Sequence, residues 1–352
     1  MNPPLTYRPW GDLGWALGLS EPKQWSFLGC LGTEQRSVAG LVKLHHAGIL
    51  EDVALVRIRD TIPCDPSAED EAIQANTLIC GKEGLTFATQ KLTLEAPLNA
   101  GTWPMGFDFS GKTNVCIDIS SMPKRFFFSA VKQAVNSREV RNLLILYSVP
   151  ERYPKAPQVI SSNPNQWTSM DNFRLIDPAL QQEVDSHLII CAGFVVDGLA
   201  AYLKNRTSAM RRSMLIPFPA EQWSSVRRSW ESARSIDESL QIGNDEAFAR
   251  YAEPCRRVGA YDSAGAFEIL LGLTNCGEQP AALAPLGPKP ISLAFCLLAA
   301  QSESHPVYYA QPRTYAVDYS TGCKSTHAYW IKHDGENFYG LSDARLRMRG
   351  QS

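Results

Sequence analysis

Short apolar runs alternate with longer amphipathic stretches in the first half of the chain, a pattern typical of strands alternating with helices. Trp25–Gly32 and Asn142–Val149 are almost wholly apolar, which predicts strands buried on both faces of a sheet. The predicted strands of this half are Trp25–Gly32, Asp52–Ile58, Leu85–Leu94, Asn114–Ile119 and Asn142–Val149. The predicted helices between them are Val38–His46, a segment capped by Ser67, and Phe126–Val135.

The clearest part of this pattern lies between residues 114 and 149. A strand there is followed by Ser120 and Ser121, either of which can cap the next helix, and by Pro123 near its first turn. A second strand follows the helix. Two strands joined by a crossover helix pair in parallel through a right-handed connection, so we expect a parallel sheet.

The second half of the chain repeats this alternation. Its predicted strands are Ser186–Phe194, Arg212–Phe218, Pro280–Leu286 and Pro306–Ala310, with an extra strand or hairpin in Tyr315–Lys332. Its predicted helices are Val195–Lys204, Glu221–Ser235, Ala264–Leu273 and Ile291–Gln301. The plan is repeated, although no residue-level repeat is visible in the sequence.

The alternation predicts an α/β protein made of two Rossmann-like halves, each with a mostly parallel sheet flanked by helices. We expect an N-terminal domain at residues 1–150, a linker at 151–180 and a C-terminal domain at 181–352. The linker is expected because prolines are frequent and long apolar runs are few in that stretch.

Composition narrows the class of protein. The 352 residues carry 34 basic and 36 acidic side chains, a net charge of −2, which does not favour a nucleic-acid binder. The longest apolar runs, such as Ile291–Ala300, are too short to span a membrane, and the first twelve residues lack the apolar core of a signal peptide. We therefore expect a cytoplasmic protein with no membrane partner.

The nine cysteines are scattered, with no CxxC pair and no grouping with histidine at zinc spacing. Neither a metal site nor a disulfide framework is expected. No P-loop, GxSxG or HExxH motif occurs, and no cofactor is predicted.

Two glycine-bearing turns in the second half are candidate ligand sites. Gly193, followed by Asp197, ends an apolar strand, where a ligand can approach backbone N–H groups closely. Gly287 and Lys289 stand between a strand and a helix. A lysine at a helix N-terminus opposes the helix dipole, and a bound anion would relieve that conflict. A packing role for Gly193 and a solvated Lys289 are the structural alternatives.

A third candidate follows the strand that ends at Asp118. A carboxylate at the end of an apolar strand must be paired or face a cleft. Ser120 can cap the next helix or bind a ligand, and Arg125 can pair with Asp118. A cap with an ion pair and a ligand-facing group are both compatible with this pattern.

Glu34 and Arg36 occupy the same position after the strand Trp25–Gly32. If the two strands are neighbours, Glu34, Arg36, Asp118 and Arg125 share one rim of the sheet. Arg36 and Arg125 are then candidate ligand-binding residues, together with Ser120. Glu34 and Asp118 are then candidate catalytic carboxylates, as a general base or as stabilisers of a cationic transition state. A network of ion pairs at the rim is the structural alternative.

The segment Ala284–Ala299 resembles the last motif of CRISPR-associated Rossmann-fold (CARF) domains, in its order of strand, Gly-x-Lys loop and long apolar helix. Gly287 and Lys289 match that loop, and Gly193 resembles the first ligand-facing turn of the family. Two threonines of the family's loop are absent here, and Pro288 lacks an N–H. The resemblance covers about residues 186–315 and implies a dimer that senses a cyclic oligoadenylate in prokaryotic antiviral defence.

Three functions remain open. The first is a nucleotide-binding sensor or regulatory subunit, as a homo-oligomer or with a partner protein, in which Lys289→Ala abolishes binding. The second is an enzyme that hydrolyses an N-glycosidic or phosphodiester bond of a nucleotide or nucleoside through Glu34 and Asp118. The third is an interaction scaffold with a decayed ligand site and a partner surface around Trp223 and Trp230.

Overall fold

The protein is described from a computed structural model. The described residues are 7–21, 23–60, 65–94, 107–153, 167–170, 173, 187–193, 211–218, 255–310, 317 and 319–349. The chain forms two compact units. The first unit consists of Tyr7–Ser161 and Pro312–Phe338, and the second of Met1–Thr6, Ser162–Gln311 and Tyr339–Ser352.

The sheet of the first unit has the strand order β1-β13-β6-β5-β2-β3-β4, with β14 paired to β13. The bounds of these strands are β1 Trp10–Asp12, β2 Trp25–Cys30, β3 Leu50–Arg59, β4 Ala88–Thr93, β5 Asn114–Asp118, β6 Asn142–Val149, β13 Ser325–His333 and β14 Glu336–Asn337. Strands β2 to β6 pair in parallel, whereas β13 is antiparallel to β6 and β1 antiparallel to β13. The expected mostly parallel sheet is confirmed.

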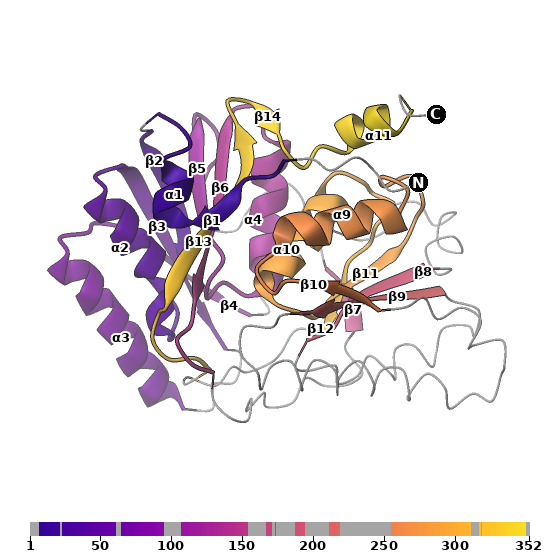
Figure 1. The fold of residues 1–352 in the computed structure, drawn as a ribbon. Coiled ribbons are helices and arrows are strands. Elements are labelled where there is room, and N and C mark those ends of the chain that lie inside the picture. The colour runs from indigo at the N-terminus through magenta and orange to yellow at the C-terminus, as the bar shows by residue number, and fades with distance from the viewer. Residues whose placement is uncertain are drawn as a thin grey trace. The chain divides into compact units, whose positions relative to one another are not determined.

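The direction in which the chain adds successive parallel strands to this sheet reverses once. From β2 the chain moves outward to β3 and β4, and it then returns to the other side of β2 to form β5 and β6. Because each crossover is right-handed, the two directions place their helices on opposite faces. Figure 1 shows α2 (Ala39–His46) and α3 (Pro66–Lys82) on one side of this sheet and α4 (Lys124–Asn136) on the other.

The core forms because the central strands are apolar on both faces. Every residue of β2 and β6 is buried. On the face of α2 and α3, the rings of Trp25 and Trp330 meet edge to face, and Trp330 donates its indole N–H to the carbonyl of Ala16 at 2.9 Å. On the other face α4 buries a run of aromatic side chains, Phe126, Phe127 and Phe128.

Local signals were predicted less well than the strands. The cap of α3 is Asp65, whose carboxylate accepts from the N–H of Ala68 at 3.0 Å, and not the expected Ser67. Pro66 occupies the first helical position, where a missing N–H costs nothing. In α4 the cap position is Pro123, which makes no side-chain cap, so neither Ser120 nor Ser121 caps that helix.

Strand β13 lies within the residues expected for the C-terminal domain, but it pairs with β6 of the first unit along nearly its whole length. The expected extra strand in Tyr315–Lys332 is therefore part of the first sheet. Lys332 explains part of this attachment, because its buried ammonium donates to the carbonyls of Ser137 at 2.8 Å and Val140 at 3.2 Å. A cation there also suits the C-terminal end of α4.

The main sheet of the second unit is parallel, with the order β10-β9-β8-β11. Its strands are β8 His187–Cys191, β9 Arg211–Pro217, β10 Arg256–Val258 and β11 Ala282–Pro285, and a separate antiparallel pair is formed by β7 Trp167–Ser169 and β12 Tyr308–Ala310. Winding again reverses once, between β8 and β11. The expectation of a second parallel sheet flanked by helices is confirmed.

Helices α9 (Ser263–Leu273) and α10 (Lys289–Ala300) lie side by side above this sheet (Figure 1). Every residue of α10 from Pro290 to Ala300 is buried, as its apolar sequence requires. At the C-terminal end of the unit, α11 (Leu341–Arg349) places Arg345 against the carbonyls of Cys276 and Gly277 after α9. Among the described helices none is both long and apolar enough to cross a membrane.

Candidate functional site

Strands β2 and β5 are hydrogen-bonded neighbours, so the segments that follow them leave the sheet at the same edge. We call the loop 31–37 after β2, together with the loop 119–123 after β5, the first switch point. In open parallel sheets, ligands bind beyond the carboxyl ends of the strands where the winding reverses. Glu34, Arg36, Asp118 and Ser120 all lie at or beside this position.

Arg36 is the centre of one half of the first switch point, and its side chain is only 2% exposed. Its Nε and Nη2 donate to Oε2 of Glu34 at 2.9 and 2.8 Å. Its Nη1 donates to the carbonyl oxygen of Ser148, at the end of β6, at 3.1 Å. The hydrogen bond to Ser148 therefore ties the loop after β2 to a strand two positions away in the sheet.

The electrostatics of Arg36 follow from these contacts. Burial lowers the pKa of Arg36, but the charge of Glu34 and the neighbouring hydroxyls of Tyr147 and Tyr153 raise it well above its ordinary value. The guanidinium also stands over the ring of Tyr147, 5.4 Å from its centre. Arg36 thus stays charged, and its charge is matched inside the protein.

Asp118 is the centre of the other half and is 1% exposed. Its Oδ1 accepts from the backbone N–H of Ser120 at 2.8 Å and from the hydroxyl of Ser120. The same hydroxyl oxygen accepts from the N–H of Ser148 at 2.7 Å. Ser120 is therefore a link between β5 and β6 and not a helix cap.

The other oxygen of Asp118 faces helix α2. A Cβ added to Gly40, near the start of α2, would lie 2.7 Å from Oδ2 of Asp118. The absence of a side chain at Gly40 thus lets α2 approach the carboxylate. A negative charge beside the first turn of a helix is stabilised by the helix dipole.

Arg125 was expected to pair with Asp118. Its guanidinium instead donates to the carbonyl oxygen of Leu94 at 2.8 Å and stands over the ring of Phe126. Arg125 is half-buried in the first turn of α4. The donors of Asp118 named above come from Ser120, the residue two positions further along the chain.

Sequence reasoning missed the residues that complete the first switch point. Ser320 donates its hydroxyl to Glu34, and Asn76 of α3 donates to the carbonyls of Gly32 at 2.8 Å and Glu34 at 3.1 Å. Ser148 joins both halves through its backbone. Asn76, Ser148 and Ser320 stand far from the predicted loops in sequence, and no local pattern around them signals this role.

The second switch point, the loops after β8 and β11, is built from backbone contacts. A Cβ added to Gly193 would lie 2.0 Å from the carbonyl oxygen of Leu286, and one added to Gly287 would lie 2.1 Å from Sγ of Cys191. The N–H of Leu286 also donates to the carbonyl of Cys191 at 3.2 Å. Both glycines are required because the two loops pass against each other, which is the packing role.

Lys289 begins α10 and is half-buried, directly after Pro288 at the cap position. The polar link between the loop and the helix comes from Ser292, whose hydroxyl is 3.2 Å from the carbonyl oxygen of Gly287. Asp197, the last predicted site residue, lies outside the described residues. So do the predicted helices Val195–Lys204 and Glu221–Ser235 that carry Trp223 and Trp230.

No cluster of three or more histidine, cysteine or acidic side chains suited to a metal ion is found within the described part of the chain. Each carboxylate of the first switch point accepts from fixed donors of its own chain. Such carboxylates are suited to accept further hydrogen bonds from ligand hydroxyls more than to exchange protons.

No family model matches the chain, and no curated protein matches it.

Proposed function

We propose that this protein binds a nucleotide-type small molecule at the first switch point and acts as a sensor or regulatory subunit. One observation carries the proposal. The chain reverses its winding between β2 and β5, and charged and hydroxyl side chains follow both strands directly. Nucleotides bind at this place in doubly wound sheets, where an acidic side chain accepts from ribose hydroxyls and N–H groups receive phosphate.

Binding is favoured over catalysis by the way the carboxylates are held. Glu34 accepts from two nitrogens of Arg36 and from Ser320, and Asp118 accepts twice from Ser120. Groups that are fixed in this way orient a ligand well but have to break contacts to move a proton. The hydrolase alternative keeps Glu34 and Asp118 as its acting residues.

We place the ligand at the first switch point because the loops of the second switch point pack too tightly against each other to admit one. The loops after β8 and β11 meet through Gly193 and Gly287 with less space than one methyl group requires. The loops after β2 and β5 meet through side chains. The resemblance to CARF domains supports a nucleotide ligand, a defence setting and assembly as a homo-oligomer or with a partner protein.

The test is native mass spectrometry of the purified protein with ATP, NAD, cyclic dinucleotides, and linear and cyclic oligoadenylates. We expect one class to be retained intact, and the same spectra give the oligomeric state. A ligand released with altered mass would assign the hydrolase function instead. Failure to retain any of these compounds would refute the proposal, and a stoichiometric copurified protein would then favour the scaffold.

A matched pair of variants tests the location. Ser121 is half-buried between the two loops, and its hydroxyl donates to the carbonyl of Cys30 at 3.0 Å. Ser121→Glu adds a negative charge there and should weaken a phosphate-bearing ligand at least about tenfold, because like charges repel. Ser121→Gln adds the same length without the charge. Equal affinity of the two variants would place the ligand elsewhere.

A further inference from the structure

Residues 319–324, which we call the strap, cross the carboxyl edge of the first sheet. At one end Lys324 donates its N–H to the carbonyl of Val149, the last residue of β6, at 2.9 Å. At the other end Ser320 donates its hydroxyl to Glu34, in the loop after β2. β5 lies between β6 and β2, and burial together with the nearby charge of Asp118 raises the pKa of the Cys323 thiol, so the strap passes beside the end of β5.

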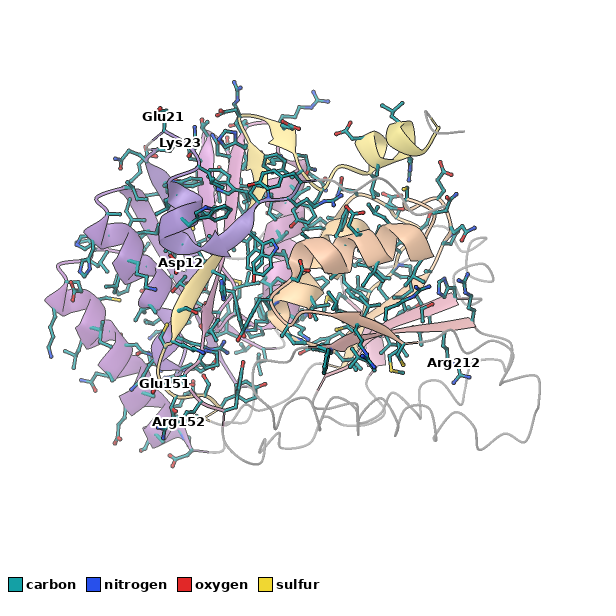
Figure 2. All side chains as sticks on the ribbon, in the orientation of Figure 1. Asp12, Glu21, Lys23, Glu151, Arg152 and Arg212 are labelled. Carbon is teal, nitrogen blue, oxygen red and sulfur yellow. The ribbon has the colours of Figure 1, made fainter. Side chains whose placement is uncertain are left out.

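The strap is attached by polar contacts and by an edge-to-face contact between the rings of Tyr319 and Tyr153. The N–H of Gly322 donates to the side-chain oxygen of Gln35 at 3.0 Å, and Thr321 exchanges backbone hydrogen bonds with Arg152 at 3.0 and 3.1 Å. Glu151 and Arg152 lie next to each other at the lower end of the first sheet (Figure 2). Ser320 is buried, Tyr319, Gly322 and Cys323 are half-buried, and Thr321 and Lys324 are exposed.

Strand β13, which follows the strap directly, is held quite differently. Its residues Ala328 to Ile331 are buried, and they pair with β6 on one side and β1 on the other. Segments with few buried apolar contacts and exposed backbone hydrogen bonds open at much lower free energy than core strands. The strap therefore meets the physical conditions for opening while β13 stays in place.

Gly322 is the candidate hinge residue of the strap. Its φ is +68°, a conformation that glycine adopts without strain. A Cβ at this position would lie 2.8 Å from Cβ of Glu151 and 2.6 Å from its carboxylate oxygen. Any side chain at residue 322 would thus destabilise the closed strap in two ways, through the backbone and through the contact with Glu151.

We propose that residues 319–324 open as a unit about Gly322 and so uncover the first switch point, which makes the strap an autoinhibitory cover of that site. The opening is a property of the chain itself. Its role in admitting a ligand rests on the proposed function, because a ligand that binds only the open form pays the free energy of opening.

Amide hydrogen exchange of Gly322→Ala tests the opening without any ligand. We expect exchange at Thr321 and Lys324 to rise at least about tenfold, together with exchange at Glu151 and Arg152, whose N–H groups donate to the carbonyl of Thr321. Exchange at Trp330, within β13, should stay within about twofold of the wild type. Thr321→Ala is the matched control, since its exposed side chain is removed while the backbone bonds of residue 321 remain.

Two results would overturn the opening. One is unchanged exchange at Glu151 and Arg152 while Thr321 exchanges faster, which would mean that the strap does not separate from the end of β6 as a unit. The other is a parallel rise at Trp330, which would make residues 319–324 part of the core of β13.

Nucleotide binding then tests the role of the strap. The retained nucleotide should bind Gly322→Ala more tightly by the same factor as the rise in exchange. An unchanged or weaker affinity would refute the autoinhibitory role. If neither protein binds any nucleotide, the proposed function fails, whereas the exchange data still decide whether the strap opens.

Discussion

In the first unit the loops after β2 and β5 carry charged and hydroxyl side chains, whereas in the second unit the loops after β8 and β11 pass directly against each other at two glycines. Both sheets reverse their winding at this position. Both continue from it into a helix that starts with Pro-Lys, as Pro123-Lys124 in α4 and Pro288-Lys289 in α10. One sheet plan thus carries two different kinds of switch point.

The two prolines show how similar the starts of α4 and α10 are. Pro123 has φ −58° and ψ 147°, and Pro288 has φ −54° and ψ 149°, each at the cap position of its helix. The difference lies in the residues just before them. Ser120 in the first unit carries a hydroxyl that links two strands, and Gly287 in the second has no side chain at all. The chemistry of each switch point is therefore set by one or two side chains on a shared frame.

The largest effect is expected when the positive charge at the centre of the first switch point is removed. Arg36→Met leaves Glu34 buried without its cation and should lower the free energy of unfolding by about 3–5 kcal/mol. Urea denaturation followed by amide exchange in β2 and β6 measures the loss in this unit. The double variant Glu34→Gln/Arg36→Met should recover at least half of it, and no recovery would mean that the two residues do not act as a pair.

The second switch point should instead be sensitive to size. Gly193→Ala puts a methyl group against the carbonyl of Leu286 and should cost about 3 kcal/mol in the second unit, measured by the same method. Gly32→Ala is the control from the first switch point. Its Cβ would meet Ser121 at 3.0 Å, so we expect a loss of about 1 kcal/mol. Equal losses would remove the distinction between the two switch points.

Acid should destabilise the second unit, because that unit buries the neutral His305. Burial lowers the pKa of His305 to about 4, with Arg345 nearby and opposing contributions from the backbone of Ala281 and Gly277. The unfolded chain binds a proton near pH 6.5, so stability is lost as the pH falls from about 6.5 to 4. Between pH 7 and 5 the loss should be about 2 kcal/mol.

Urea denaturation of the second unit at both pH values measures this loss. His305→Gln cannot gain the proton and should abolish most of the difference. A pH dependence that persists in this variant would assign it to other groups.

The smallest effect is expected for Lys289→Ala. Its side chain is half-buried at the start of α10, and with the nucleotide at the first switch point we expect affinity to change less than about twofold. Native mass spectrometry or calorimetry with the retained nucleotide measures it. Abolished binding with an unchanged melting temperature would move the site to the second switch point and support the CARF-like placement.

Much of the fold could be predicted from the sequence because it depends on local patterns of apolar and polar residues. The almost wholly apolar strands β2 and β6 predict burial on both faces, and the strand–helix–strand segment 114–149 predicts parallel pairing. The edge where Glu34 and Asp118 lie followed from the same reasoning. The interpretation of Gly193 as a packing glycine was one of two open alternatives, and its contact with Leu286 could be seen only in three dimensions.

The contacts that could not be predicted join residues that are far apart in the sequence. Glu34 receives a hydroxyl from Ser320, and Arg36 donates to the backbone of Ser148, at separations that no periodicity encodes. The same holds for β13, because its apolar residues would suit either sheet equally well. Asp65 was missed as a cap for a different reason, since Ser67 two residues later is an equally good cap by residue type.

The position of β13 also bears on how the chain is made. Strand β6 cannot gain its outer neighbour, nor β1 its partner, until residue 333 has been synthesised. The segment Ser162–Gln311 emerges from the ribosome before that point, but its unit also contains Tyr339–Ser352, which is synthesised last. Both units are therefore completed only near the C-terminus, and a nascent or truncated chain carries an open edge on the sheet that holds the first switch point.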